Sequence, residues 1–462
     1  MKPPAGVRPR SGTAADILAL SLPMLVSQLA GIGTHIADTI ITARHDTLDV
    51  AAVAVGSGLF MSVAIALIGV LYAAAPIVAH HMGAGQREDI APAFQQAVWL
   101  ALFLSIPGVL LLAYPSPLLS LSALDAEVDR RTREYLLALA AALPASLLFR
   151  AFQATLSGLG QPRPVMVIML ACLALHVPLA WCLTTGAFGL PALGALGCGV
   201  STLCVNWLSA LCALACLLRQ PSLRSLDLLG NWQAPRARAQ RELLRLGGPM
   251  GISNFVEVTS FALIALFVAR LGADVVAGHR IVGNLNGLCF MLPLALGSGT
   301  LVRVGQAAGG RDWRAARHAA LTGFTLACSL AALLAALLWW QRDVLLALFG
   351  GSTEVREVAA ALMPYVALFV VVDASHTLAS FALRGYKVTL QPMLIHTVCF
   401  WGIGLGLGYV LAFHGMEFAG TELHRAPMGA AGFWLATLLS TVCAGLAIGA
   451  LLWRTVQRSM KD

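Results

Sequence analysis

The chain has 462 residues, of which 58% are hydrophobic and only 11% are charged. Soluble domains carry about 25% charged residues, so this composition excludes an ordinary soluble protein and predicts a polytopic membrane protein. The formal net charge is +8, but the basic residues lie in short connections between apolar stretches. We therefore interpret them as topology signals and expect the lipid bilayer, not a nucleic acid, as the partner.

Twelve apolar stretches are each long enough to cross roughly 30 Å of hydrocarbon as a helix. In chain order, the predicted helices cover residues 15–43, 50–82, 95–114, 135–156, 165–185, 197–218, 243–271, 275–305, 314–340, 357–383, 392–413 and 429–453. The predicted fold class is an all-α polytopic membrane protein, with twelve transmembrane helices in two pseudo-symmetric six-helix bundles.

The two halves of the chain repeat each other. The matching pairs include Asp49-Val50 with Asp274-Val275, and Pro23-Met24 with Pro249-Met250. Six helices per half give both halves the same orientation, so we expect a symmetry axis along the membrane normal and a site at the interface between halves. The predicted domains are an N-terminal bundle at residues 1–218, a cytoplasmic linker at 219–241 and a C-terminal bundle at 242–462.

Basic residues concentrate on one side of this twelve-helix arrangement. They are Lys2, Arg8 and Arg10 before the first helix, Arg219, Arg224, Arg236, Arg238 and Arg241 in the linker, Arg311, Arg314 and Arg317 after the eighth helix, Arg384 and Lys387 after the tenth, and Arg454, Arg458 and Lys461 at the end. The other side has fewer, although Arg130, Arg131 and Arg133 cluster there beside acidic residues. Cytoplasmic loops are enriched in Lys and Arg. We therefore predict a multi-pass protein of the bacterial inner membrane with both termini cytoplasmic.

Three acids interrupt the apolar stretches, namely Asp38, Glu257 and Asp373. An ionisable group in hydrocarbon is costly and usually functional. Asp38 could take up and release protons, or it could be capped for packing alone. Glu257 and Asp373 could share a proton or hold Na⁺ through oxygen ligands, or each could satisfy backbone freed by a bend. We favour function and predict these three residues as the cation-coupling and substrate-binding site.

Polar neighbours of the three acids are secondary candidates. They are His35 and His376, which lie three residues from Asp38 and Asp373, together with His176 beside Pro178 and Asn254 just before Glu257. Arg150, Arg280 and Arg303 are expected near helix ends, where their heads can reach water. The ten cysteines lack CxxC spacing and are expected to be packing residues, not disulfides or a metal site.

Other functional classes lack their signatures in this sequence. There is no Walker A loop, HExxH or GxSxG motif, which disfavours ATP-driven transport and an intramembrane enzyme. A channel would more typically show a filter sequence or rings of like charge. A flippase for lipid-linked oligosaccharides or similar lipids stays open as an alternative, although its phosphate cargo would favour a basic cavity and this core is acidic.

The chain resembles the multidrug and toxic compound extrusion (MATE) family, in particular its NorM-like branch. The segments that carry the resemblance are Ala37-Asp38-Thr39, Ala51–Gly56, Pro76–Ala79 with Gly83–Gly85, Phe255-Val256-Glu257, Val276–His279, Val302–Ala307, Asp373, Leu383–Tyr386 and Trp401–Gly404. The resemblance implies a twelve-helix exporter that exchanges cationic or amphipathic drugs for H⁺ or Na⁺. It also implies coupling or binding at Asp38, and cation binding at Glu257 and Asp373.

The sequence departs from this family in ways that concern the coupling ion. Sodium-coupled relatives often have Tyr one turn before the tenth-helix acid, where this chain has Phe369, and relatives commonly have Asn where it has His176 and Ala180. His35 beside Asp38 is also unusual, and an imidazole suits protons. We lean to H⁺ over Na⁺, and we expect no other cofactor, small organic cations as substrates, and a monomer.

Overall fold

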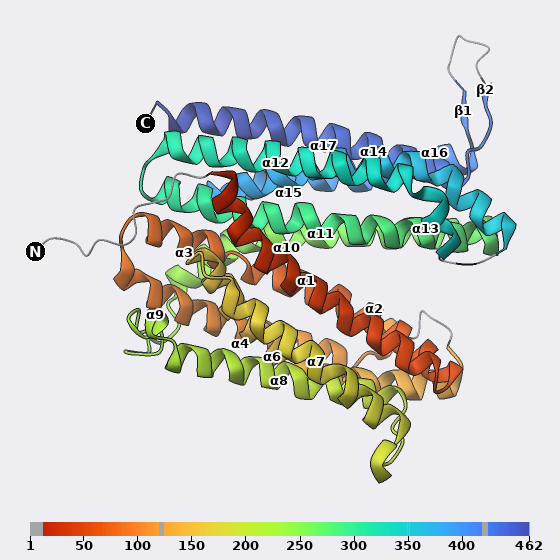
Figure 1. Ribbon diagram of the computed structural model, residues 1–462, viewed down its shortest axis with the longest axis horizontal. Coiled ribbons are helices and arrows are strands. Elements are labelled where there is room, and N and C mark those ends of the chain that lie inside the picture. Colours follow the sequence, from red (N-terminus) through yellow and green to blue (C-terminus); the bar gives the residue numbers. More distant parts are fainter. Residues whose placement is uncertain (1–12, 120–123, 349, 351, 418–423, 462) are drawn as a thin grey trace, which may run out of the picture. The chain divides into compact units, whose positions relative to one another are not determined.

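The computed structural model describes residues 13–119, 124–348, 350, 352–417 and 424–461 (Figure 1). Twelve helices in this part of the chain are long and apolar enough to span a membrane, which confirms the predicted number. The basic residues Lys2, Arg8 and Arg10, which were used to predict the topology, lie outside the described residues.

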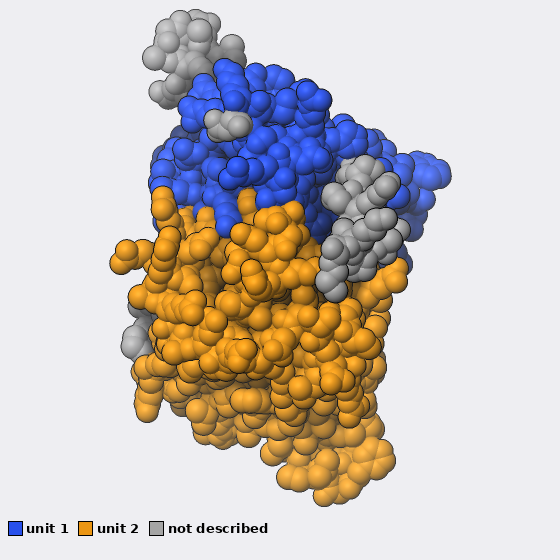
Figure 2. Space-filling model, turned by 90° about the vertical axis from the view of Figure 1, so that its left-hand side faces the viewer, with its two compact units in different colours: residues 1–21, 252–462 blue, residues 22–251 orange. Residues whose placement is uncertain are grey.

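The chain divides into two compact units, residues 22–251 and residues 1–21 with 252–462 (Figure 2). The first holds α2 (Thr47–Leu71), α3 (Ala74–Gly83), η1 (Arg87–Asp89), α4 (Ile90–Ala113), α5 (Ser116–Leu119), α6 (Ala126–Gly158), α7 (Arg163–Thr185), η2 (Ala187–Gly189), α8 (Ala195–Arg219) and α9 (Pro221–Arg224). The second holds η3 (Ala269–Leu271), α11 (Ala273–Gly309), α12 (Trp313–Trp340), α13 (Arg342–Leu348), α14 (Thr353–Gly385), α15 (Leu390–His396), the π-helix η4 (Thr397–Leu407), α16 (Gly408–Phe413), β1 (Met416–Glu417), β2 (His424–Arg425) and α17 (Ala430–Ser459). The domain limits predicted from the sequence stay a prediction.

Local structure differs from the prediction in four places. The helix predicted at 50–82 is interrupted between α2 and α3, and the one predicted at 392–413 contains the π-helical stretch η4. A two-residue antiparallel ladder joins β1 and β2 in a chain otherwise predicted to be all-α. The connection at 219–241 is not bare linker, because it contains α9 and the start of α10 (Ala237–Val268).

The two units repeat the same helix-packing scheme. In the first unit, α6 is the central helix and packs against α2, α3, α4 and α8. In the second unit, α14 takes this place and packs against α11, α12 and α17. These helices are the second, third, fourth and sixth spans of each half, so the sequence repeat corresponds to a repeat of packing.

Small residues let the central helix α6 approach its neighbours closely. Its buried face carries several alanines, and it ends at Gly158, where an added Cβ would lie 2.6 Å from the Ala75 carbonyl oxygen. Small residues are enriched at helix contacts in membranes because dispersion contacts, not the hydrophobic effect, hold the helices together there. The small residues of α6 therefore allow several helices to pack closely around it, which explains its central position.

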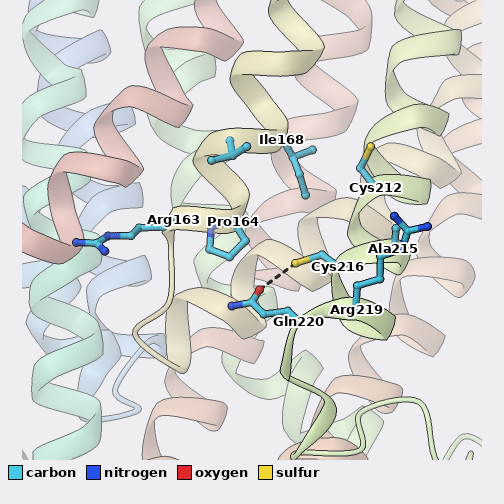
Figure 3. A pocket seen from close by; sticks show the side chains of 9 residues that line it. Arg163, Pro164, Ile168, Cys212, Ala215, Cys216, Arg219 and Gln220 are labelled. Atoms are coloured by element: carbon cyan, nitrogen blue, oxygen red, sulfur yellow. Dashed lines mark hydrogen bonds between the residues drawn. The ribbon is translucent and has the colours of Figure 1, made fainter. Parts of the chain in front are cut away.

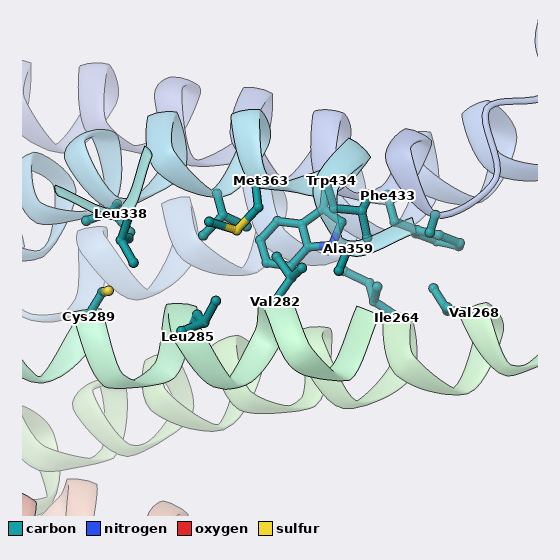
Figure 4. Packing of buried hydrophobic residues seen from close by; sticks show 14 of the residues in the cluster. Ile264, Val268, Val282, Leu285, Cys289, Leu338, Ala359, Met363, Phe433 and Trp434 are labelled. Atoms are coloured by element: carbon teal, nitrogen blue, oxygen red, sulfur yellow. The ribbon is translucent and has the colours of Figure 1, made fainter. Parts of the chain in front are cut away.

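In the second unit, aromatic and aliphatic side chains fill the space between α11, α14 and α17. Met363 and Trp434 point toward Val282 and Leu285 of α11, and all four side chains are buried (Figure 4). The Trp434 indole nitrogen, which would be costly to bury unpaired, donates a 3.2 Å hydrogen bond to His279 Nδ1. This packing fixes the position of α14, and the same helix carries polar residues closer to its C-terminal end.

The helices α1 (Ala14–Ala43) and α10 are each divided between the two units, close to an internal proline. The first turns of α1 belong to the second unit, where Ile17 packs against Leu296 and Leu378. The first part of α10 belongs to the first unit, where Gly247 lies directly against the backbone of Val70. The divisions fall next to Pro23 and Pro249, each of which removes a backbone hydrogen bond from its helix.

A pair of buried glutamines fastens the chain segment before α10 to α4. Gln95 Nε2 donates to the carbonyl oxygen of Gly230 at 2.8 Å, and its Oε1 accepts from the backbone nitrogen of Gln233 at 2.9 Å. Gln96 makes the equivalent contacts with Ala234 and Arg236, at 3.0 and 2.9 Å. The segment between the two halves is therefore held in place on the first unit.

Replacement of Gln96 should loosen this segment. We expect Gln96→Leu to cost about 0.5–1.5 kcal/mol for each lost hydrogen bond, because the leucine cannot replace the bonds that the buried Gln96 amide makes to Ala234 and Arg236. Trypsin should then cleave the full-length protein faster at Arg236. The exposed Gln86 provides the control, and Gln86→Leu should leave cleavage unchanged. Equal cleavage rates in wild type and Gln96→Leu would contradict this role.

An ion cluster joins the beginnings of α2 and α6. Arg131 Nη1 lies 2.6 Å from Asp46 Oδ2 and 2.9 Å from Asp49 Oδ1, and His45 Nδ1 lies 2.8 Å from the other Asp49 oxygen. The Asp49 side chain is 2% exposed and that of Arg131 is 23% exposed. The Arg131 hydrogen bond, followed by one from the Leu48 backbone, lowers the pKa of Asp46, which lies between α1 and α2.

Candidate ion-coupling sites

The first candidate site joins α1 and α7 in the unit formed by residues 22–251. Asp38 lies near the end of α1, and its Oδ1 is 2.8 Å from Nε2 of His176 in α7. The two residues are 138 positions apart in sequence, and they are only 4% and 1% exposed. A buried carboxylate needs a partner that can offset its lost hydration, and here that partner is an imidazole.

The hydrogen bonds around His176 can accommodate two protonation states. Ser201 Oγ lies 3.5 Å from His176 Nδ1 and donates to the Cys198 carbonyl oxygen at 2.9 Å. A hydroxyl has one hydrogen, so while Ser201 donates to Cys198 its oxygen can accept from a protonated Nδ1. If the ring is neutral, the hydroxyl can instead turn and donate to Nδ1. The Ser201 hydroxyl can therefore follow a proton on or off His176.

Other titratable groups lie around this pair. His35 of α1 interacts electrostatically with Asp38, His176 and Arg150, although its ring forms no hydrogen bond with any residue that the structure describes. Tyr135 of α6 and Cys198 of α8 also lie within electrostatic range of Asp38. From the sequence, His35 and His176 are both secondary candidates, whereas in the structure His176 is the direct partner of Asp38.

The second candidate site lies in the other unit and joins α10, α14 and α15. Glu257 of α10 is half-buried and interacts electrostatically with Asp373, His376 and Arg384 of α14. Asp373 is 4% exposed, and its Oδ1 lies 3.6 Å from Nδ1 of His376. That distance is within ion-pair range when His376 is protonated, but it is too long for a hydrogen bond.

His376 makes its short contact with a residue that the sequence analysis missed. Nε2 of His376 lies 2.7 Å from Nε2 of His396 in α15, and each residue is 2% exposed. The His396 ring also stacks on Phe400, with ring centroids 5.4 Å apart. No local pattern marks His396, because it is a single histidine in an apolar stretch whose partner lies twenty positions away.

Asn254 lies close to this second site but is engaged elsewhere. Its Oδ1 accepts a 3.3 Å hydrogen bond from Nη2 of Arg384, a residue that is 8% exposed. The arginine also lies over the Phe381 ring at 4.4 Å. Asn254 therefore helps to hold a buried positive charge near the two acids.

Two of the arginines expected near helix ends, Arg150 and Arg303, are partly buried and have polar partners. Arg150 is in the interior of α6 and donates a 2.7 Å hydrogen bond to Gln153. Arg303 lies 3.8 Å from Asp16 of α1 and is 18% exposed. Each therefore has a polar partner within its own unit, which lowers the cost of keeping the charge away from water.

The oxygen donors around Glu257 and Asp373 determine which cations this site could hold. The two carboxylates are available, but the Asn254 oxygen is occupied by Arg384, and Phe369 supplies only a ring. A nearby guanidinium also opposes a second permanent cation. Among the residues that the structure describes, no three His, Cys, Asp or Glu side chains form a metal-binding cluster.

Twelve apolar spans in two repeated halves, each with a buried acid beside a histidine, define a polytopic membrane protein of the repeated-bundle class. The MatE family model matches residues 23–182 and again residues 249–410. The chain therefore belongs to the MatE family. Its two matches correspond to the two halves of the repeat, and its membership places it among transporters, not enzymes.

Individual relatives and solved structures agree with this placement. The chain is 51% identical to "Probable multidrug resistance protein NorM" of Aromatoleum aromaticum, over 94% of this chain and 93% of that protein. It is 34% identical to "Multidrug resistance protein NorM" of Vibrio vulnificus, over 95% of each. A structure titled "Outward-facing conformation of a multidrug resistance MATE family transporter of the MOP superfamily" matches with TM-score 0.88 at 17% identity and covers 100% of both chains.

Proposed function

We propose that this protein is a secondary multidrug efflux antiporter, which exports organic cations and amphipathic drugs in exchange for H⁺ or Na⁺. The observation that carries the proposal is one buried acid site in each half of a MatE-family chain, at Asp38 and at Glu257 with Asp373. The 51% identity to a protein named for multidrug resistance supports the substrate class. The flippase alternative has no comparable support.

The chemistry of antiport follows from these two sites. When the acids hold cations, their charge is neutralised and the helices that carry them can repack at lower cost. When the cations leave, the freed carboxylates attract a cationic drug. The membrane potential contributes about 2.3 kcal/mol for each charge moved through 100 mV, so more than one cation per cycle gives a large driving force.

We infer that H⁺ is the coupling ion. The Asp38 carboxylate oxygen that contacts His176 already has a nitrogen partner, and the hydroxyl of Ser201 can follow a proton. These are features of a proton site, not of the oxygen cage that a metal cation requires. We further propose a monomer in the bacterial inner membrane, with cytoplasmic termini supported by the arginines of the linker and by Arg311, Arg314 and Arg317.

Purified protein in proteoliposomes tests both the transport and the ion. An imposed pH gradient should drive norfloxacin or ethidium transport at constant Na⁺, whereas a Na⁺ gradient at constant pH should not. Asp373→Asn and Glu257→Gln should each lower the pH-driven rate by at least about tenfold, equivalent to 1.4 kcal/mol. Glu354 at the exposed start of α14 provides the control, and Glu354→Gln should transport normally.

The outcomes separate the parts of this proposal. Transport driven by Na⁺ alone would overturn H⁺ coupling and keep the antiporter. Full pH-driven transport in Asp373→Asn and Glu257→Gln would remove the second site. The absence of drug transport under either gradient, with correctly folded protein, would overturn the proposed activity itself.

A further inference from the structure

A groove opens between the start of α7 and the end of α8, and none of its lining residues belongs to either candidate ion site. Its volume is about 560 Å³, and its apolar lining includes Val167, Ile168 and Ala215. Arg163 and Arg219 stand at opposite sides of this lining, with Cys216 and Gln220 between them (Figure 3). The groove therefore combines an apolar wall with two positive charges at one end of the two helices.

The charge at this end of the groove is not neutralised by protein. Arg163 and Arg219 are exposed, and neither forms an ion pair with any residue in the part of the chain that the structure describes. The lining includes no acidic side chain among the described residues. Arg163 also begins α7, whose N-cap residue Pro162 provides no side-chain hydrogen bond. The amides of that first turn add partial positive charge.

The apolar wall continues along the membrane-spanning part of both helices. Leu170 is one turn beyond Val167 on the same face of α7, and Leu211 is one turn before Ala215 on the same face of α8. These two leucines are 42% and 58% exposed. Leu170 lies about 10 Å along the helix axis from Arg163, at 1.5 Å per residue. An extended hydrocarbon chain could follow this surface away from the arginines.

We propose that this groove is a binding site for an anionic phospholipid. Its anionic headgroup lies at the end of the groove that Arg163 and Arg219 flank, and one acyl chain follows Leu170 and Leu211. Guanidinium groups form paired hydrogen bonds with phosphate oxygens, and basic pockets between membrane helices bind anionic headgroups. A free phosphate would leave the apolar wall uncovered, and a cationic drug would be repelled by the two arginines.

Lipid titration of the purified full-length protein, followed by native mass spectrometry, tests the site. The wild type should bind phosphatidylglycerol at least about tenfold more tightly than phosphatidylcholine, equivalent to 1.4 kcal/mol. Arg163→Gln with Arg219→Gln should abolish this preference. Ala215→Phe, which fills the groove without changing its charge, should lower the affinity for phosphatidylglycerol. Arg238→Gln with Arg241→Gln removes the same charge from the exposed start of α10 and should preserve the preference.

Three results would overturn the proposal. The first is equal affinity of the wild type for the two lipids. The second is an equal loss of preference in the Arg238 and Arg241 control, which would indicate a general charge effect. The third is complete displacement of the lipid by inorganic phosphate at matched concentration, which would mean that the apolar wall contributes nothing. Because binding is measured without transport, the result is independent of the proposed antiport.

Discussion

Asp38→Asn is expected to reduce drug efflux by at least about tenfold, equivalent to 1.4 kcal/mol. The asparagine keeps the size of the side chain and can still accept a hydrogen bond from His176 Nε2, whose contact with Asp38 is 2.8 Å long. The negative charge is lost, however, so the pair can no longer change its charge as a proton arrives. Loss of transport without loss of folding would therefore identify the charge, and not the packing, as the functional property.

The companion variants separate Asp38 from its partner. His176→Gln keeps a hydrogen-bond donor beside Asp38 but cannot titrate, so we expect a lower rate and a weaker dependence of that rate on pH. Asp16→Asn changes an acid at the other end of the same helix, where Asp16 lies 3.8 Å from Arg303, and should preserve efflux. The measurements are ethidium efflux from cells and pH-driven transport in proteoliposomes. Normal efflux in Asp38→Asn would rule out this residue as a coupling site.

Arg131→Leu is expected to cost about 3 kcal/mol of unfolding free energy, because it leaves the buried charge of Asp49 without its main partner. Asp49 is 2% exposed, and its Oδ1 lies 2.9 Å from Arg131. An added Cβ on Gly194, in the connection before α8, would overlap the Asp49 carboxylate. The chain therefore covers this acid closely, and entry of water would require the connection to move.

Arg130→Leu provides a matched control for this loss of stability. Arg130 is the adjacent residue and pairs with Glu127 and Glu134, but its side chain is 56% exposed. Exposed pairs contribute about 0.2–1 kcal/mol, so this variant should be nearly as stable as the wild type. Adding Asp49→Asn to Arg131→Leu should restore part of the loss, because the stranded charge is then absent. Denaturant titration in mixed micelles measures all four proteins. Equal stability of Arg130→Leu and Arg131→Leu would contradict the role of burial.

Much of the protein's class was predictable from local sequence properties. Hydropathy along the chain predicted twelve spans, and the structure confirms that number. The pairs Asp49-Val50 and Asp274-Val275 indicated a repeat, and the family model matches the chain twice. The cost of an acid in hydrocarbon drew attention to Asp38, Glu257 and Asp373. The coupling roles of these three acids stay a prediction that the variants above test.

The tertiary structure alone decided the partners of those acids and the course of the long helices. Hydropathy is a property of each residue and its near neighbours, so it counts spans well. The contact between Asp38 and His176 spans 138 positions, and that between His376 and His396 joins two different helices. Which side chains meet depends on how the helices pack. That packing depends on how the small residues and surface shapes of distant helices fit together, and a short stretch of sequence does not show which helices will pair. For the same reason, the internal prolines of α1 and α10 did not by themselves predict that each helix is divided between the two units.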